Sequence, residues 1–125
     1  MDLNQVTVGC LDLEASVRFY ERLGLRLIVN DPPEYARFEC PAGHATFSLH
    51  RVERMADGAT TVVYFEVEDL DATARALERS GVAFEAGPRD QPWLWREAHL
   101  RDPAGNLVCL FHAGTNRRFP PWRIP

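Results

Sequence analysis

The sequence repeats itself once, and this repeat limits the folds that the chain can adopt. Asp12 recurs as Asp69 and Gly24 recurs as Gly81, both after 57 residues. In each copy a short strand precedes the aspartate, an amphipathic helix follows it, and the glycine ends the helix. A helix start and a helix end that recur at one spacing predict two copies of the same structural unit.

Each copy also contains further strands, which the alternation of apolar and polar residues predicts. The predicted strands cover residues 4–10, 25–29, 35–40, 45–51, 61–67, 82–86, 92–101 and 106–112, with a loop at 87–91. The predicted fold class is therefore α+β, with two tandem βαβββ modules. Two such sheets placed side by side would form a curved mixed sheet around a pocket, with Gln5, Thr7 and Tyr64 on its inner face.

The chain length of 125 residues predicts a single domain. We expect module one at about 1–52 and module two at about 60–112, joined by a polar linker at 53–60. A C-terminal arm at 113–125 is expected to be extended. Because a half of about 60 residues is marginal alone, the two halves should share or exchange their cores.

Composition and charge exclude several function classes. The formal net charge is −4, which argues against a nucleic-acid partner. All 14 basic residues are arginine, so lysine Schiff-base chemistry is excluded. The three cysteines include no CxxC pair, which is typical of free thiols in a reducing compartment. The amino terminus lacks the features of a signal peptide and no apolar run spans a membrane, so we expect a cytoplasmic protein without a membrane partner.

Three segments carry a resemblance to a known family. The segments VTVGCLDLEASVRFYERLGL, VYFEVEDLDATARALERSG and RDPAGNLVCLF resemble the vicinal oxygen chelate superfamily of glyoxalase I, bleomycin-resistance proteins and extradiol dioxygenases. With the strands between them, the resemblance covers nearly the whole chain and is specific for the fold. It is weakly specific for function, because the superfamily includes lyases, isomerases, dioxygenases, thiol transferases and drug-binding proteins.

In the metal-using members of this superfamily, side chains from both sheets bind one divalent ion. The resemblance places Gln5, Val62 and Cys109 at three of these positions. The fourth falls on Ser48 by the usual strand match or on Phe47 by the internal repeat, and Ser48 is preferred because Phe47 suits the helix-facing side. A divalent ion prefers imidazole, thiolate or carboxylate donors. The resemblance therefore supports the fold and implies neither the usual metal nor another cofactor.

The candidate site residues are those expected on the inner face of the sheets. The predicted binding residues are Gln5, Thr7, Ser48, His50, Tyr64, Trp95, Cys109 and Phe111. His50 and His112 occupy equivalent places in the repeat, each at the end of a strand. Glu66 is a candidate general base, but a solvent-exposed position at a strand end is favoured for it.

The leading functional hypothesis is a metal-independent small-molecule binding protein that resembles the bleomycin-resistance proteins and performs no catalysis. The alternative is a glyoxalase-like lyase or isomerase with a rearranged site drawn from Gln5, His50, Cys109 and also His112, holding zinc, nickel or manganese. A third hypothesis is a protein-interaction module that has lost its pocket. The expected partners are a small-molecule ligand and a second copy of the chain, with the 113–125 arm packed across the homodimer.

Overall fold

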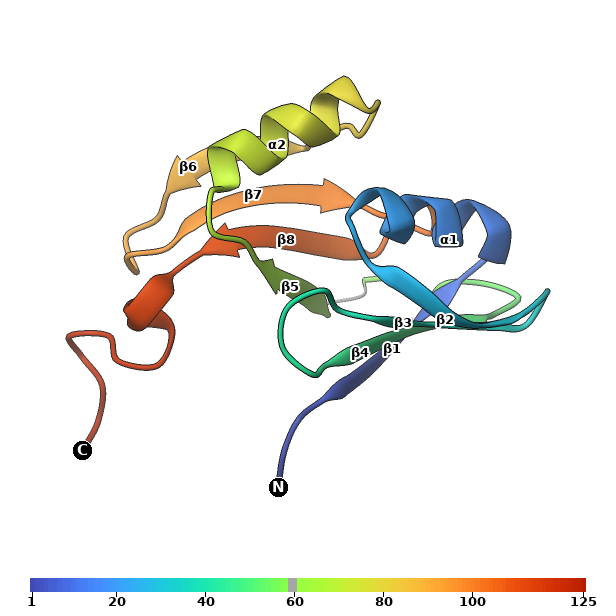
Figure 1. The fold of residues 1–125 in the computed structure, drawn as a ribbon, viewed down its shortest axis with the longest axis horizontal. Coiled ribbons are helices and arrows are strands. Elements are labelled where there is room, and N and C mark those ends of the chain that lie inside the picture. The colour runs from blue at the N-terminus through green and yellow to red at the C-terminus, as the bar shows by residue number, and fades with distance from the viewer. Residues whose placement is uncertain (59–60) are drawn as a thin grey trace. The chain divides into compact units, whose positions relative to one another are not determined.

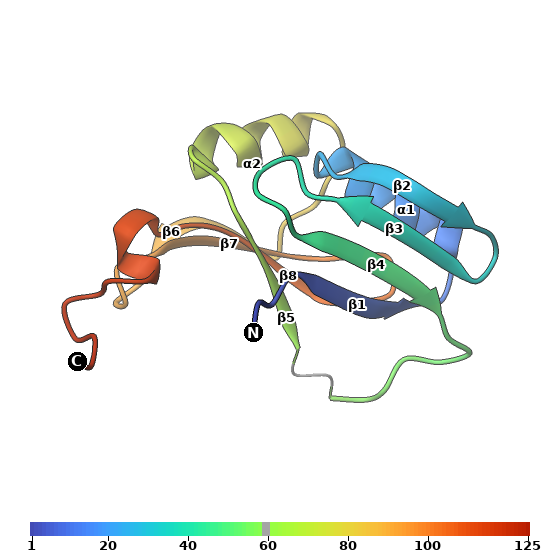
Figure 2. The ribbon, with the colours of Figure 1, turned by 60° about the horizontal axis from the view of Figure 1, so that its bottom comes forward.

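The computed structural model describes residues 1–58 and 61–125, which form two helices, eight strands and one short 3-10 helix. The chain divides into two units, and the first comprises residues 1–60 and 102–106. Its elements are β1 (Gln5–Cys10), α1 (Leu13–Arg22), β2 (Arg26–Asp31), β3 (Tyr35–Glu39) and β4 (Thr46–Arg51). The strands form one mixed sheet in the order β1-β4-β3-β2, in which β1 is parallel to β4 (Figures 1 and 2).

Helix α1 covers one face of this sheet. The carboxylate of Asp12 accepts a 3.0 Å hydrogen bond from the Ala15 backbone amide and begins the helix. Gly24, at φ 97°, follows its last residues in a left-handed conformation that favours glycine. Leu13, Val17 and Tyr20 on its apolar side are buried, and the centroid of the Tyr20 ring lies 4.5 Å from that of the Phe47 ring of β4. Phe47 therefore faces the helix, and its neighbour Ser48 points to the opposite face.

The second unit comprises residues 61–101 and 107–125. Its elements are β5 (Val62–Glu66), α2 (Leu70–Arg79), β6 (Ala86–Asp90), β7 (Arg96–Arg101), β8 (Leu107–His112) and the 3-10 helix at Gly114–Arg117. The sheet order β5-β8-β7-β6 repeats that of the first unit, with β5 parallel to β8. The predicted α+β class with two βαβββ modules is confirmed. The assembly of both sheets around one pocket stays a prediction.

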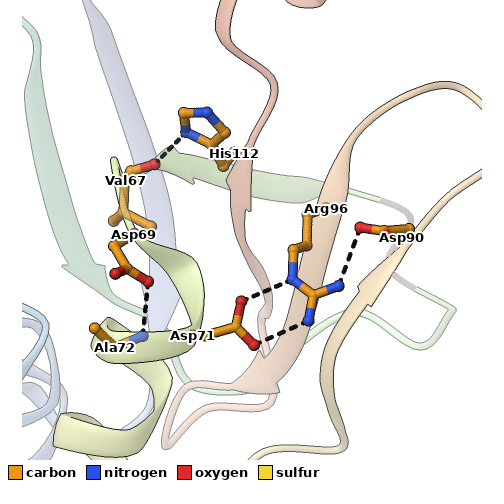
Figure 3. Close-up of polar contacts among 7 residues, drawn as sticks. All are labelled: Val67, Asp69, Asp71, Ala72, Asp90, Arg96 and His112. Carbon is orange, nitrogen blue, oxygen red and sulfur yellow. Dashed lines mark hydrogen bonds and ion pairs between the residues drawn. The ribbon is translucent and has the colours of Figure 1, made fainter.

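A network of ion pairs holds α2 on its sheet (Figure 3). Asp69 caps the helix through a 2.9 Å hydrogen bond from the Ala72 amide. Two guanidinium nitrogens of Arg96 on β7 donate to the two carboxylate oxygens of Asp71 on α2, at 2.8 and 2.9 Å. A third donates to Asp90 on β6 at 3.0 Å. One arginine thus joins the first turn of the helix to two strands.

The turn between β7 and β8 belongs to the first unit, although both strands belong to the second. The Gly105 amide donates to the Asp102 carbonyl at 2.9 Å, and Asp, Pro and Gly at positions 102, 103 and 105 favour a type I turn. The Tyr20 hydroxyl donates to the Asp102 carboxylate at 2.7 Å, and the Asn106 side chain donates to the Gly9 carbonyl at 2.8 Å. Five residues from the second half of the chain, 102–106, therefore belong to the first unit.

Some predicted boundaries are wrong. The strand predicted at 82–86 instead runs from Ala86 to Asp90, where a loop was expected. Val82 is buried. Its backbone amide donates a hydrogen bond to the Leu77 carbonyl at the end of α2, so Val82 takes no part in a strand. The Gly and Pro of β6 are tolerated because β6 is an edge strand with a register shift between Ala86 and Arg89.

Two further expectations need correction. Trp93 and Trp95 precede β7 instead of lying within a strand, and the 113–125 arm contains the 3-10 helix instead of being extended throughout. The predicted linker at 53–60 includes residues 59 and 60, which lie outside the described residues. Its remaining residues, 53–58, contain turns and neither helix nor strand.

Candidate binding site

The face of the second sheet that points away from α2 carries most of the chemically useful side chains. Strand register places Tyr64 beside Cys109 and Cys109 beside His99. The next row of the same face places Glu97 beside Phe111. Alternation sends the buried residues between them to the helix side; these are Ala98, Leu100, Val108 and Leu110. The sheet therefore separates an apolar core from a mixed aromatic and polar face.

Three aromatic rings form the wall of an open hollow on this face. The Trp95 and Phe111 rings are stacked, with centroids 4.7 Å apart and planes inclined by 20°. The Tyr64 ring stands edge-on to both, at 6.0 Å from Trp95 and 5.6 Å from Phe111. Tyr64 is 48% exposed, so its ring meets solvent. The hollow measures ≈ 440 Å³ and is completed by Glu66 and Arg117.

Glu66 ties the C-terminal segment to this wall. One of its carboxylate oxygens accepts hydrogen bonds from the Ala113 and Gly114 amides at 3.0 and 2.9 Å, and the other pairs with Arg117 at 3.2 Å. These contacts use both oxygens of the carboxylate. Glu66 is therefore neither the freely solvated residue that the sequence favours nor an unengaged base.

A compact polar cluster lies next to the aromatic wall. The carboxylate of Glu97 is 3% exposed, and it accepts a 2.6 Å hydrogen bond from the Trp93 indole nitrogen. Its second oxygen lies 2.9 Å from the Nε2 atom of His99, whose side chain is 33% exposed. Ligand atoms of Glu97, His99 and Cys109 all lie within 4.8 Å of one another.

The negative charge of Glu97 influences the neighbouring acids. Burial raises the pKa of the Cys109 thiol to about 12, and the charge of Glu97 together with a hydrogen bond to it adds to this rise. The thiol is therefore protonated at neutral pH and is a poor nucleophile. Burial also raises the pKa of Tyr64, with smaller contributions from Cys109 and Glu97.

The corresponding face of the first sheet is a hydrogen-bonded polar network. Ser48 is buried, accepts a 2.6 Å hydrogen bond from the Gln5 amide nitrogen and shares a 2.8 Å hydrogen bond with the Tyr35 hydroxyl. Arg37 donates to the same hydroxyl at 2.8 Å. The hydrogen bond with Ser48, followed by the effect of Arg37, lowers the pKa of Tyr35. The Gln5 amide oxygen accepts from the Thr46 hydroxyl.

The structure thus distributes the predicted site residues over two faces. Gln5, Thr7 and Ser48 lie together on the first sheet, where the Gln5 amide nitrogen is 3.4 Å from the Thr7 hydroxyl. His50 lies on the same sheet and is exposed. The predicted residues of the second sheet are those of the aromatic wall and its neighbour, namely Tyr64, Trp95, Cys109 and Phe111. That any of them binds a ligand stays a prediction.

His112, the repeat equivalent of His50, has a structural partner. Its Nδ1 atom lies 2.8 Å from the Val67 carbonyl oxygen, at the junction of β5 with α2 (Figure 3). This contact joins the end of β8 to the segment that enters the helix. His112 therefore contributes to the packing of the second unit.

Glu97, His99 and Tyr35 are not among the site residues that the sequence predicts. The available signal was a spacing of two residues within a strand, which places Glu97 with His99, and Tyr35 with Arg37, on one face. The spacing alone does not show that Glu97 is buried or that its carboxylate accepts a hydrogen bond from the Trp93 indole, because both depend on the fold.

Comparison with known proteins agrees with the architecture. Residues 2–110 match the family model of the Glyoxalase/Bleomycin resistance protein/Dioxygenase superfamily, and the chain belongs to this superfamily. It is 32% identical to the uncharacterized protein YraH of Bacillus subtilis over 127 residues, which cover 89% of this chain and 98% of YraH.

Solved structures show the same fold. A glyoxalase/bleomycin resistance protein/dioxygenase from Nocardioides has a TM-score of 0.76 and 26% identity, covering 100% of this chain and 90% of that one. A lactoylglutathione lyase from Agrobacterium tumefaciens has a TM-score of 0.76 and 22% identity, covering 94% and 97%. Within the described residues, no helix has the length and apolar composition needed to cross a membrane.

The residues at the usual metal positions of this superfamily do not fit a divalent ion. Both ends of the Gln5 amide are engaged within the first sheet, by Ser48 and Thr46. Val62 has no side-chain donor atom, which leaves Cys109 as the one thiol, imidazole or carboxylate side chain among these positions. A site of this kind needs three or four imidazole, thiolate or carboxylate donors. The chain therefore departs from the usual ligand set of its family.

Proposed function

We propose that this protein binds a small organic molecule on the open face of its second sheet, in the manner of a bleomycin-resistance type binding protein. The binding needs no metal ion and no reaction accompanies it. The observation that carries this proposal is the solvent-open wall of Tyr64, Trp95 and Phe111. Such rings provide a large apolar contact area with defined edges and faces.

The surroundings of the wall support a ligand that is mainly flat and apolar with polar ends. The hollow of ≈ 440 Å³ falls within the usual range of small-molecule sites, roughly 300–1,000 Å³. Glu66 and Arg117 place one negative and one positive group at its border. Aromatic faces would bind the body of the ligand, and the charged border would orient its polar groups.

The enzymatic alternative has less support from the side chains on which it depends. Gln5 is hydrogen-bonded at both ends of its amide, and His112 contacts the Val67 carbonyl. The raised pKa of Cys109 disfavours a thiolate in the protein alone. A lyase or isomerase built from Gln5, His50, Cys109 and His112 would have to break several of these contacts.

The test is a ligand screen of chelator-treated protein, read by thermal unfolding and by tryptophan fluorescence. A molecule that binds the native state raises the unfolding midpoint by mass action. We expect planar aromatic compounds to raise it and to change the fluorescence, and Trp95→Ala to abolish both effects. Ile28→Ala is the matched control, because Ile28 is an exposed apolar residue of the first unit and does not line the hollow. Equal binding by the Trp95→Ala variant would refute the assignment.

We also propose a homodimer in which the C-terminal arm contacts the partner. Phe119, Trp122 and Ile124 are 60%, 58% and 83% exposed, an unusual concentration of apolar side chains on one segment. Light scattering after size exclusion should give twice the mass of the chain, and Trp122→Ser should shift the population toward monomer. A monomeric wild-type protein at micromolar concentration would contradict this proposal.

A further inference from the structure

We propose that Glu97, His99 and Cys109 form a binding site for a borderline-soft divalent ion of the zinc type. The site lies within the second unit, on β7 and β8, and it is separate from the residues that line the aromatic hollow. It uses one position of the family's usual set, Cys109, and replaces the others with two residues from a neighbouring strand.

The three donor types suit such an ion. Carboxylate oxygen, imidazole nitrogen and thiolate sulfur are all ligands of zinc, and three protein ligands with a fourth position left open are typical of its non-structural sites. Within the described residues, this is the one trio of His, Cys, Asp or Glu side chains whose ligand atoms converge in this way.

The distances need little adjustment. Zinc–ligand bond lengths of about 2.0–2.3 Å place tetrahedral donors about 3.3–3.8 Å from one another. The donor atoms of the trio lie within 4.8 Å of one another, and Glu97 and His99 lie 2.9 Å apart. Small side-chain rotations therefore suffice, with the His99 imidazole turning from its hydrogen bond with Glu97 toward the ion.

The strands hold the donors in place. His99 and Cys109 are direct partners in the β7–β8 register, and Glu97 lies two residues before His99 on the same face. The Trp93 indole donates to one Glu97 oxygen at 2.6 Å, which orients the carboxylate and leaves the other oxygen toward His99. A hydrogen bond of this kind to a ligand is a common support of metal sites.

Electrostatics also favour a cation here. Glu97 is almost fully buried, and its negative charge disfavours ionisation of the neighbouring thiol. A divalent ion would compensate the carboxylate and stabilise the thiolate. On binding, the S–H bond of Cys109 breaks, an S–metal bond forms and the proton passes to solvent. The partly exposed edge of His99 provides the route of entry.

The experiment is a titration of the chelator-treated, reduced protein with Co²⁺, followed by displacement with Zn²⁺. We expect one ion per chain, visible d–d bands of a tetrahedral site and a near-ultraviolet charge-transfer band from thiolate to cobalt. Because binding releases the thiol proton, the apparent affinity should rise about tenfold per pH unit near neutrality.

Variants assign the bands to the trio. Cys109→Ser should remove the charge-transfer band, and His99→Gln should weaken binding by at least about tenfold. Cys40→Ser is the matched control, since Cys40 is a free cysteine of the first unit and should leave the spectrum unchanged. If circular dichroism shows that Cys109→Ser does not fold, the cobalt affinity of His99→Gln decides whether the site exists. The His99 side chain is partly exposed, so this variant should fold.

Three outcomes would overturn the site: no stoichiometric cobalt binding, a charge-transfer band that survives Cys109→Ser, or full affinity in His99→Gln. The result is independent of the proposed function. Trp95→Ala should bind cobalt as the wild type does, and His99→Gln should keep the fluorescence response to organic ligands, because His99 does not line the hollow. Failure of one proposal can therefore be distinguished from failure of the other.

Discussion

The hydroxyl of Tyr20, in α1, donates a 2.7 Å hydrogen bond to the carboxylate of Asp102, 82 residues later in the chain. Both residues are buried. The carboxylate also accepts hydrogen bonds within its own turn, from the Ala104 amide and from the backbone and side-chain nitrogens of Asn106. The bond to Tyr20 is thus a link between the turn and the helix of the first unit.

Tyr20→Phe should destabilise the protein by about 1.5–3 kcal/mol, because a buried carboxylate loses a hydrogen-bond donor. Urea denaturation followed by circular dichroism measures the change. Tyr64→Phe is the matched control, since Tyr64 is about half exposed and its hydroxyl lies on the open face. Equal stabilities of the two variants would mean that the Tyr20 hydroxyl contributes nothing.

Cys109 should make the protein less stable in alkali. The pKa of its thiol is about 12 in the folded protein against an ordinary value of 9.0. Between these pH values the unfolded chain releases the proton and the folded chain keeps it, so the free energy of unfolding falls as pH rises. In Cys109→Ala the slope of stability against pH should be shallower by about 1.4 kcal/mol per pH unit. Parallel curves for the two proteins from pH 9 to 12 would exclude this linkage.

Arg96→Gln should loosen α2 from its sheet. The variant loses two hydrogen bonds to Asp71 and one to Asp90, so its urea midpoint at pH 7 should lie below that of the wild type. Hydrogen bonding to Arg96 lowers the pKa of Asp71, so this stability is present at neutral pH and is lost as pH falls below the ordinary aspartate range. Urea midpoints at pH 7 and in acid measure both effects. Arg18→Gln, which removes the exposed pair with Glu14, should change neither; an equal loss there would discount the Arg96 network.

Ser48→Ala should raise the pKa of Tyr35. The hydrogen bond from Ser48 is the main cause of the lowered value, and Arg37 adds to it. An absorbance titration of tyrosinate, compared with the Tyr35→Phe variant to assign the signal, measures the shift. Thr7→Val is the control, because Thr7 contacts Gln5 and not Tyr35. An unchanged titration in Ser48→Ala would show that the serine does not stabilise the phenolate.

The sequence predicts the fold well because the repeat has strong local signals. Asp12 and Asp69 cap the helices and Gly24 and Gly81 follow them, as expected from their side chains and backbone freedom. The weakest prediction concerned β6, whose Gly87-Pro88 pair is typical of a loop. Its pairing with β7 is a tertiary effect that local preference cannot reveal.

The candidate site was less accessible to sequence reasoning. Alternation was enough to place Tyr64, Cys109 and Phe111 on one face. The cluster around Glu97 depends on the register of β7 against β8. A slip of one residue in this register would turn Glu97 and His99 away from Cys109, so the spacing within β7 alone could not place the three side chains together.

Residues 102–106 give the first unit a hydrogen bond that has no counterpart in the repeat. The positions equivalent to Tyr20 and Asp102 are Leu77 and Cys40, and neither side chain can form a hydroxyl–carboxylate hydrogen bond. The two modules are therefore not interchangeable, and a circularly permuted chain must keep the segment 102–106 intact to preserve the partner of Tyr20.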